Sequence, residues 1–160
     1  MNKDYKNPDL KIEDKELLKF LVSVDLFDNL SKLERKNLLK YIYVRNYKKN
    51  EVIFKKGYPD VVLYIVKSGK LKVYLDEKSG AKEVNILQTK EFVGEMGLFL
   101  NENRTASVSA LEDSTLLAVS KRDLSEFIAK FPRAGLKIMY KLGEILCNHI
   151  LQLNDRIAGE

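Results

Sequence analysis

The sequence is poor in residues that bind metals or form cross-links. Its 160 residues contain a single cysteine, Cys147, and a single histidine, His149. One cysteine cannot close a disulfide within the chain, and a zinc site needs several imidazole or thiolate ligands. We therefore expect no metal site, no cofactor and no redox role. Because Cys147 lies in an apolar stretch, we interpret it as a buried, unreactive thiol.

Long apolar runs are also missing. A membrane-spanning helix needs about 20 consecutive apolar residues, and no run in the sequence approaches that length. The first residues, Met1–Leu10, are polar and of mixed charge, unlike a secretory signal. Apolar residues make up 45% of the chain and charged residues 32%, as is typical of a soluble globular protein. We expect one cytoplasmic domain that does not contact a membrane.

Basic residues are in mild excess over acidic residues, but they are not clustered in the sequence. The chain has 28 Lys and Arg against 23 Asp and Glu, a formal net charge of +5. The basic residues are spread along the chain, whereas modules that bind duplex DNA gather them along a recognition helix. This distribution favours an anionic ligand and predicts no direct binding of DNA.

Residues 1–40 have the pattern of helices. Leucines recur at helical spacing from Leu17 to Leu21, after an acidic stretch. A second helix is predicted to begin after Ser31. Ser31 and Glu34 have the spacing of a capping box, in which each side chain binds the backbone amide of the other residue. These residues are therefore assigned as an N-terminal helical segment.

Between residues 41 and 120 the apolar period changes to two, which is typical of half-buried strands. Eight short strands are predicted, at Tyr41–Asn46, Glu51–Phe54, Val61–Lys67, Lys70–Leu75, Lys82–Gln88, Glu91–Val93, Ala106–Leu111 and Thr115–Val119. No helix is interposed to carry parallel crossovers, so we expect antiparallel pairing through hairpins. The predicted fold is mainly β: a double-wound antiparallel β-roll, or jelly roll, with N-terminal helices and two C-terminal helices.

Residues 121–160 return to a helical period. Ser120 and Asp123 have the spacing of a helix cap, and Pro132 separates a first helix from a longer one. The longer helix carries a seam of side chains spaced three and four residues apart, formed by Met139, Leu142, Leu146, His149 and Leu153. Such a seam is typical of helices that pair side by side. It predicts a homodimer through the C-terminal helix.

One segment, residues 92–108, fits none of these periods. Its glycines, Gly94 and Gly97, allow a sharp turn into a short helix, and backbone amides that converge there could bind a phosphate. Arg104 could fork onto two phosphate oxygens, while Glu95 could accept hydrogen bonds from sugar hydroxyls. An ion pair between Glu95 and Arg104 that closes a surface loop is an equal alternative on spacing alone.

The same segment resembles a known family. The run Gly94-Glu-Met-Gly-Leu98, followed by Arg104-Thr-Ala-Ser-Val108, resembles the phosphate-binding cassette of cyclic-nucleotide-binding domains. These are the regulatory modules of cyclic-nucleotide-dependent kinases, gated channels and the bacterial catabolite activator. The resemblance covers about residues 25–155, through Leu26-Phe27-x-x-Leu30, Glu51-Val-Ile-Phe54-x-x-Gly57, Tyr64-Ile-Val-Lys-Ser-Gly69 and Val73-Tyr74. Gly97 is common in bacterial members and favours a bacterial source; Val93 departs from the family, where an aromatic residue is common.

The resemblance implies roles for individual residues. Glu95 would accept the ribose 2′-hydroxyl, Arg104 would pair with the cyclic phosphate, and backbone amides would complete the site, those of Gly94, Met96, Gly97, Thr105 and Ala106. Thr105 resembles members that accept cGMP as well as cAMP, so either nucleotide is an expected ligand. The final helix would fold over the base as a lid, with Leu146, His149 and Leu153 as candidates; for these residues the helix seam is the alternative.

We therefore predict a regulatory module without catalytic residues that binds cAMP or cGMP and transmits occupancy through its C-terminal helices. Residues 1–40, 41–120 with the cassette at 92–108, and 121–160 would form one domain. The output would pass through an unidentified effector protein or through self-association, because no helix-turn-helix follows before Glu160. Two alternatives stay open: a β-roll scaffold that binds proteins but no nucleotide, and a metal-dependent jelly-roll enzyme, against which the single histidine argues.

Overall fold

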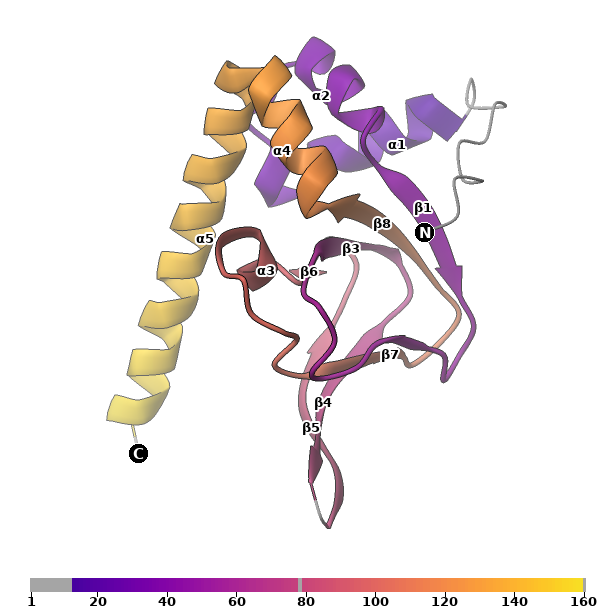
Figure 1. The fold of residues 1–160 in the computed structure, drawn as a ribbon, viewed down its shortest axis with the longest axis vertical. Coiled ribbons are helices and arrows are strands. Elements are labelled where there is room, and N and C mark those ends of the chain that lie inside the picture. Colours follow the sequence, from indigo (N-terminus) through magenta and orange to yellow (C-terminus); the bar gives the residue numbers. More distant parts are fainter. Residues whose placement is uncertain (1–12, 78, 160) are drawn as a thin grey trace.

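The N-terminal helices form where the sequence places them. The computed structural model describes residues 13–77 and 79–159 (Figure 1). It begins with α1 (Glu13–Val22), a 3-10 turn η1 (Asp25–Phe27) and α2 (Lys32–Leu39). The capping box is confirmed, since the Ser31 amide donates to Glu34 Oε2 at 2.7 Å and the Glu34 amide donates to Ser31 Oγ at 3.2 Å. Residues 1–12 of the predicted helical segment lie outside the described residues.

Within the described residues eight strands follow, and they form two antiparallel sheets, as predicted. One sheet has the order β1 (Tyr43–Tyr47), β8 (Ser114–Ser120), β3 (Val62–Ser68), β6 (Phe92–Val93). The other has the order β2 (Val52–Phe54), β7 (Ser107–Ala110), β4 (Leu71–Glu77), β5 (Gly80–Leu87). The expected hairpin pairing holds for β4 and β5; the other described strands pair with partners distant in sequence, which is the double winding of a roll.

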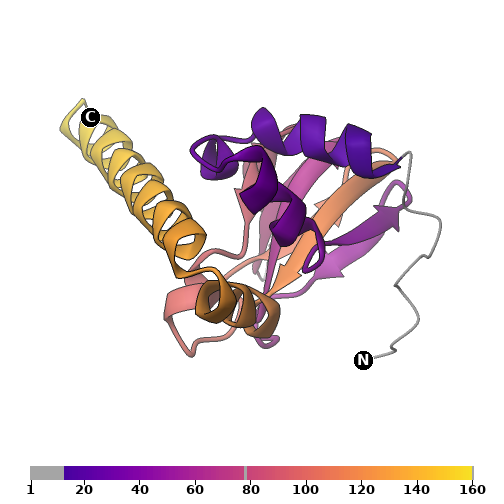
Figure 2. The same cartoon turned by 90° about the horizontal axis from the view of Figure 1, so that it is seen from above.

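Two apolar cores result from this arrangement. The first lies between the sheets and contains Val66, Leu71, Leu87, Val108, Ala110 and Leu116. The second lies on the opposite face of the β1-β8-β3-β6 sheet, where Leu63 and Leu117 pack against Phe27, Phe127 and Ile138 from the helices. Figures 1 and 2 show α1, α2 and α4 over this face of the sheet. Neighbouring residues of β8 point to opposite faces of the sheet, so Leu116 packs in the first core and Leu117 packs in the second.

The C-terminal helices are α4 (Lys121–Lys130) and α5 (Pro132–Ala158). The predicted cap is confirmed, because the Asp123 amide donates to Ser120 Oγ at 3.0 Å. The first half of α5 packs on the second core through Ile138 and Leu142, and the second half projects away from the body (Figures 1 and 2).

Two predictions for α5 are wrong. Cys147 is exposed rather than buried, because it lies where the helix leaves the body. The predicted seam does not lie on one free surface: Leu142 is buried in the core, whereas His149 and Leu153 are exposed.

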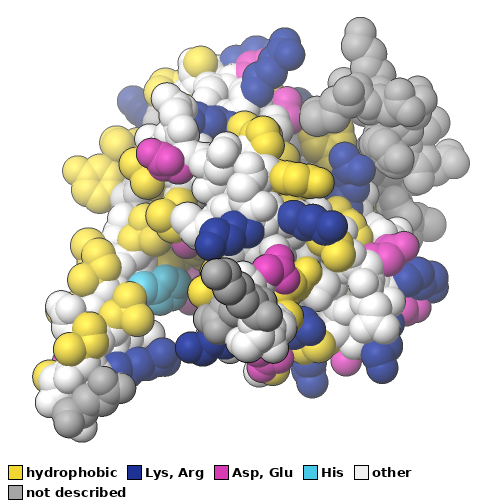
Figure 3. Space-filling view, turned by 60° about the horizontal axis from the view of Figure 1, so that its bottom comes forward, with side chains coloured by type: hydrophobic (Ala, Val, Ile, Leu, Met, Phe, Trp, Pro, Cys, Tyr) yellow, Lys and Arg dark blue, Asp and Glu magenta, His cyan; other side chains and the backbone are white. Residues whose placement is uncertain are grey.

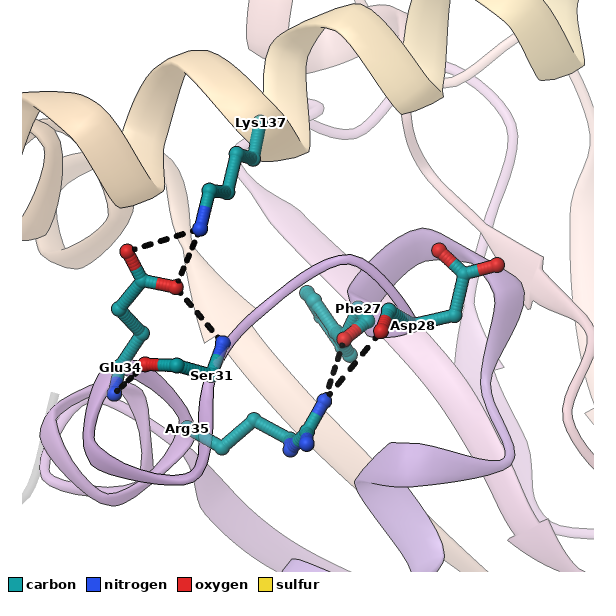
Figure 4. A network of polar contacts seen from close by, with 6 residues as sticks. All are labelled: Phe27, Asp28, Ser31, Glu34, Arg35 and Lys137. Carbon is teal, nitrogen blue, oxygen red and sulfur yellow. Dashed lines mark hydrogen bonds and ion pairs between the residues drawn. The ribbon is translucent and has the colours of Figure 1, made fainter.

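Polar contacts fix the first half of α5 to the N-terminal helices (Figure 4). Lys137 Nζ lies 2.9 Å from Glu34 Oε2, and Lys141 Nζ lies 3.3 Å from Asp28 Oδ2. Arg35 supports the same region by donating to the Phe27 carbonyl at 3.1 Å. The hydrogen bond from Lys137, with that from the Ser31 amide, lowers the pKa of Glu34. We call Glu34–Lys137 and Asp28–Lys141 the hinge ion pairs.

Candidate functional site

The cassette backbone turns sharply after β6. Gly94 has φ +93°, a conformation that a residue with a Cβ atom rarely adopts, and Glu95 then leads into the single turn α3 (Met96–Phe99). The chain returns to β7 through Arg104, whose amide donates to the Tyr58 carbonyl at 2.7 Å. The Arg104 carbonyl accepts from the Gly57 amide at 2.8 Å. The backbone of Arg104 is therefore held against the turn that precedes β3.

The Arg104 side chain is buried, with 5% of the residue exposed. Nη1 forms an ion pair with Asp60 Oδ1, and Nη2 donates to the Val62 carbonyl at 2.8 Å. The guanidinium Cζ lies 3.8 Å from the centroid of the Phe54 ring, close enough for a cation–π interaction. The alternative of a Glu95–Arg104 ion pair is thus wrong, because Arg104 pairs with Asp60 instead.

The electrostatics of this pair are set by its burial. Loss of water raises the pKa of Asp60 and lowers the pKa of Arg104, and each charge offsets part of the shift in the other. The Gly97 amide also donates to the Asp60 carboxylate. Arg104 Nε, by contrast, is buried and has no hydrogen-bond partner among the described residues. An unpaired buried donor is costly, so this nitrogen is suited to an acceptor from a ligand.

Gly94 and Gly97 are required in the cassette because atoms of neighbouring residues lie where a Cβ atom would be. A Cβ atom at Gly94 would overlap Arg104 Nη1 and the Val62 carbonyl. A Cβ atom at Gly97 would overlap the backbone and carboxyl group of Asp60. Both glycines therefore let the turn between β6 and α3 approach the buried ion pair directly.

The structure brings some of the predicted site residues together and separates others. Gly94 lies against Arg104, and Gly97 lies against Asp60, the ion-pair partner of Arg104. Glu95 is half-buried, and its charge favours the ionised Arg104. Met96 and Thr105 are exposed, and Ala106 is half-buried.

The lid candidates lie on α5, away from this group. Leu146 is half-buried against the second core, and His149 and Leu153 are exposed. Among the described residues, no hydrogen bond or ion pair joins α5 to the cassette.

The surroundings of Arg104 were not predicted from the sequence. Asp60 lies 44 residues before Arg104 in the chain and has no local pattern that would single it out. Phe54 and Tyr64 lie on predicted strands, and no contact with Arg104 was predicted for them. Both pack against the core between the sheets, and both lie near the guanidinium, whose Cζ is 3.8 Å from the Phe54 centroid and 5.9 Å from the Tyr64 centroid. An aromatic pair of this kind could have been sought once Arg104 was identified as a buried cation.

The described residues contain neither a metal-binding cluster nor a membrane-spanning helix. Within residues 13–77 and 79–159, no group of three or more His, Cys, Asp and Glu side chains is placed to hold a metal ion. No helix in that part of the chain is long and apolar enough to cross a membrane.

Comparisons with known proteins agree with this geometry. A model of the cyclic nucleotide-binding domain family matches residues 44–131. A cyclic AMP receptor protein from Thermus thermophilus is 33% identical over 130 residues, which cover 81% of this chain and 60% of the relative. A cGMP-dependent protein kinase from Eimeria tenella is 34% identical over 105 residues, 66% of this chain but 10% of the kinase. The chain thus spans only a small part of its kinase relatives.

Solved structures show the same fold. A cyclic nucleotide-binding domain from Methylobacillus flagellatus superposes with a TM-score of 0.79 at 22% identity, over 93% of this chain and 84% of that structure. The Thermus thermophilus catabolite activator protein has a TM-score of 0.73 at 28% identity, over 84% of this chain and 62% of that structure. The resemblance stated from the cassette residues and the predicted β-roll are both confirmed.

Proposed function

The chain belongs to the cyclic nucleotide-binding domain family, and from this premise we propose that it binds cAMP or cGMP at the cassette and acts as a regulatory module without catalysis. One observation carries the proposal: a buried guanidinium beside two glycines retains a donor, Arg104 Nε, without a partner. A phosphate oxygen would supply that acceptor and a charge-assisted hydrogen bond. Relatives named for cAMP and for cGMP both support this class of ligand.

Asp60 would act as a positioning residue for Arg104. It engages Nη1, and the Val62 carbonyl engages Nη2, so Nε is left for the ligand. The aromatic ring of Phe54 fixes the plane of the guanidinium from one side.

The remaining roles follow the resemblance. Glu95, half-buried at the start of α3, would accept the ribose hydroxyl. The amides of Gly94, Met96, Thr105 and Ala106 would face the phosphate. The Gly97 amide already donates to Asp60, so its contribution would be to hold that carboxylate rather than the ligand.

Occupancy would be transmitted through α4 and α5. A ligand can shift the position of α5 only by contacting it, or the cassette against it, in one arrangement and not the other. Leu146, His149 and Leu153 are the candidates for that contact. The hinge ion pairs oppose the movement because they tie α5 to η1 and α2. The output would then reach an effector protein or a second copy of the chain in the cytoplasm. Residues 1–40, 41–120 and 121–160 would act as one domain.

The proposal is tested by calorimetric titration of cAMP and cGMP into folded protein freed of bound nucleotide. We expect saturable binding that is lost in Arg104→Lys, since one ammonium cannot contact Asp60 and the Val62 carbonyl and also replace the donor Nε. Arg122→Lys is the matched control, because Arg122 is an exposed arginine outside the cassette. Folded protein that gives no heat with either nucleotide would instead favour the protein-binding scaffold.

A further inference from the structure

The outward side of α2 carries three lysines. Lys32, Lys36 and Lys40 follow one another at intervals of four residues, about one turn of helix, so they lie on the same side of α2. All three are exposed, and Leu33 beside them is 67% exposed. The other side of α2 is covered, since Leu38 is buried in the second core. The lysine side is therefore a solvent-facing surface of the domain.

The junction of α4 and α5 lies beside α2 and extends this surface. Lys137 on α5 pairs with Glu34 on α2, with 2.9 Å between Nζ and Oε2. The ring centroid of Tyr41, which follows α2, lies 5.7 Å from that of Phe127 on α4. Arg133 is exposed and precedes Lys137 by one helical turn, so it lies along the same edge of α5. We define the basic face by the exposed side chains of this surface: Lys32, Leu33, Lys36, Lys40 and Arg133.

The positive charge of the basic face is not balanced by the described residues around it. Within residues 13–77 and 79–159, none of its four cations forms an ion pair. Carboxylates nearby are engaged elsewhere, as in the hinge ion pairs Glu34–Lys137 and Asp28–Lys141. On the side of the molecule shown in Figure 3, by contrast, acidic and basic side chains are interspersed. Unpaired charge of one sign on one face attracts a partner of the opposite charge.

The residue types of the basic face favour a lipid surface over a protein or a nucleic acid. Three of its four cations are lysines, whose flexible ammonium groups suit a layer of mobile anions, whereas arginine forks onto anions held in a fixed geometry. Contact surfaces between proteins are poor in lysine and rich in arginine and aromatic residues. The basic face has one arginine and no aromatic residue. A nucleic acid backbone offers charge and would leave Leu33 exposed, whereas in a membrane interface an apolar side chain enters the boundary of the acyl chains.

We propose that the basic face binds the surface of a membrane that contains anionic lipids. The lysines would lie against the headgroups, and Leu33 would enter the interface between them. About four to eight basic residues on one amphipathic surface are the pattern typical of this contact. The sequence predicted no membrane contact because no apolar run is long enough to span a bilayer, but a contact with the membrane surface needs no such run. The proposal does not depend on nucleotide binding.

The contact is tested by sedimentation of the full chain with vesicles, either of phosphatidylcholine alone or of phosphatidylcholine and phosphatidylserine in equal parts. We expect binding to the anionic vesicles only, and it should weaken as the salt concentration rises. Lys32→Glu with Lys36→Glu should weaken binding by about 30-fold or more, since each basic residue at an anionic surface contributes about fivefold. The control, Lys49→Glu with Lys82→Glu, makes the same change in net charge on exposed residues outside the helices. It should bind within about threefold of the unchanged chain, because charges far from the membrane are screened.

The apolar contact and the kind of partner are tested separately. Leu33→Gln should weaken binding to the anionic vesicles about fivefold. Leu151 is 59% exposed on the projecting half of α5, and Leu151→Gln is the control that should bind like the unchanged chain. Circular dichroism checks that each variant stays folded. Equal loss of binding in both double variants, or no binding of the unchanged chain to anionic vesicles, would overturn the proposal. Tighter binding of duplex DNA or polyglutamate, lost in the Lys32→Glu, Lys36→Glu variant, would overturn a lipid as the occupant of this face.

Discussion

Replacing Arg104 by alanine should have two separable effects. The first is on stability: it leaves the Asp60 carboxylate buried and unpaired, and breaking a buried ion pair in this way costs about 3–5 kcal/mol. The second is on binding: losing one side of a charged, hydrogen-bonded contact costs about 2–5 kcal/mol, or roughly 30- to 4,000-fold in Kd. The single variant alone cannot distinguish lost contact from lost fold, because domain stabilities are only about 5–15 kcal/mol.

A double variant separates the two effects. Arg104→Ala with Asp60→Asn removes both charges, so most of the lost stability should return while nucleotide binding stays lost. Asp60→Asn alone keeps an oxygen acceptor for Nη1 and leaves Nε unchanged, so it should retain binding within about tenfold of the natural chain. Urea denaturation measures the free energy of unfolding, and calorimetry with cAMP and cGMP measures binding. The reasoning is refuted if the double variant binds like the natural chain, or if Arg104→Ala costs no more stability than a surface substitution.

Three further substitutions test separate parts of the account. Gly97→Ala would force a Cβ atom into the backbone of Asp60; we expect a loss of about 1–3 kcal/mol in urea denaturation and weaker nucleotide binding, and unchanged stability would contradict the close approach. Thr105→Ala should leave stability unchanged, because Thr105 is exposed, and should lower the affinity for cGMP relative to cAMP; an unchanged ratio would remove Thr105 from base recognition. Glu34→Gln tests the first hinge ion pair. The pKa of Glu34 in the folded chain lies below its ordinary value of 4.5, so the carboxylate charge stabilises the fold above pH 4.5. This stabilisation is lost as the pH falls through the lowered pKa. The variant should be about 0.5–1 kcal/mol less stable at neutral pH and equal to the natural chain in acid, and a difference that does not change with pH would show that the charge plays no part.

The strands and caps were predictable from sequence because their causes are local. Alternation of apolar residues marks a strand wherever one face is buried, and the Ser31–Glu34 and Ser120–Asp123 pairs act within a single helical turn. The pairing of the strands was harder to predict from the sequence. Consecutive strands β3 and β4 lie in different sheets, a choice made by packing between distant segments rather than by the turn that joins them.

The candidate site was predictable only in part for the same reason. Arg104 and the cassette glycines lie in one short segment, so their pattern was visible. The groups that contact the Arg104 side chain come from a turn and strands more than 40 residues earlier in the chain: Asp60, Phe54 and the Val62 carbonyl. They meet Arg104 only in the folded chain.

The seam predicted on α5 is wrong because helical spacing alone does not say which face of a helix packs on the protein's own core. The structure decides this, since Leu142 packs into the core while Ile150 stays exposed.

The most direct test of the account is the resonance of the Arg104 Nε–H group followed by NMR during titration with cAMP. The guanidinium is identified by comparison with Arg104→Lys. Because Nε has no partner in the described structure, a phosphate oxygen bound there should shift the resonance strongly and slow its exchange with solvent. Saturable binding of cAMP with an unchanged Arg104 Nε–H resonance would contradict the placement of the phosphate, and the absence of any binding would contradict the proposed function itself.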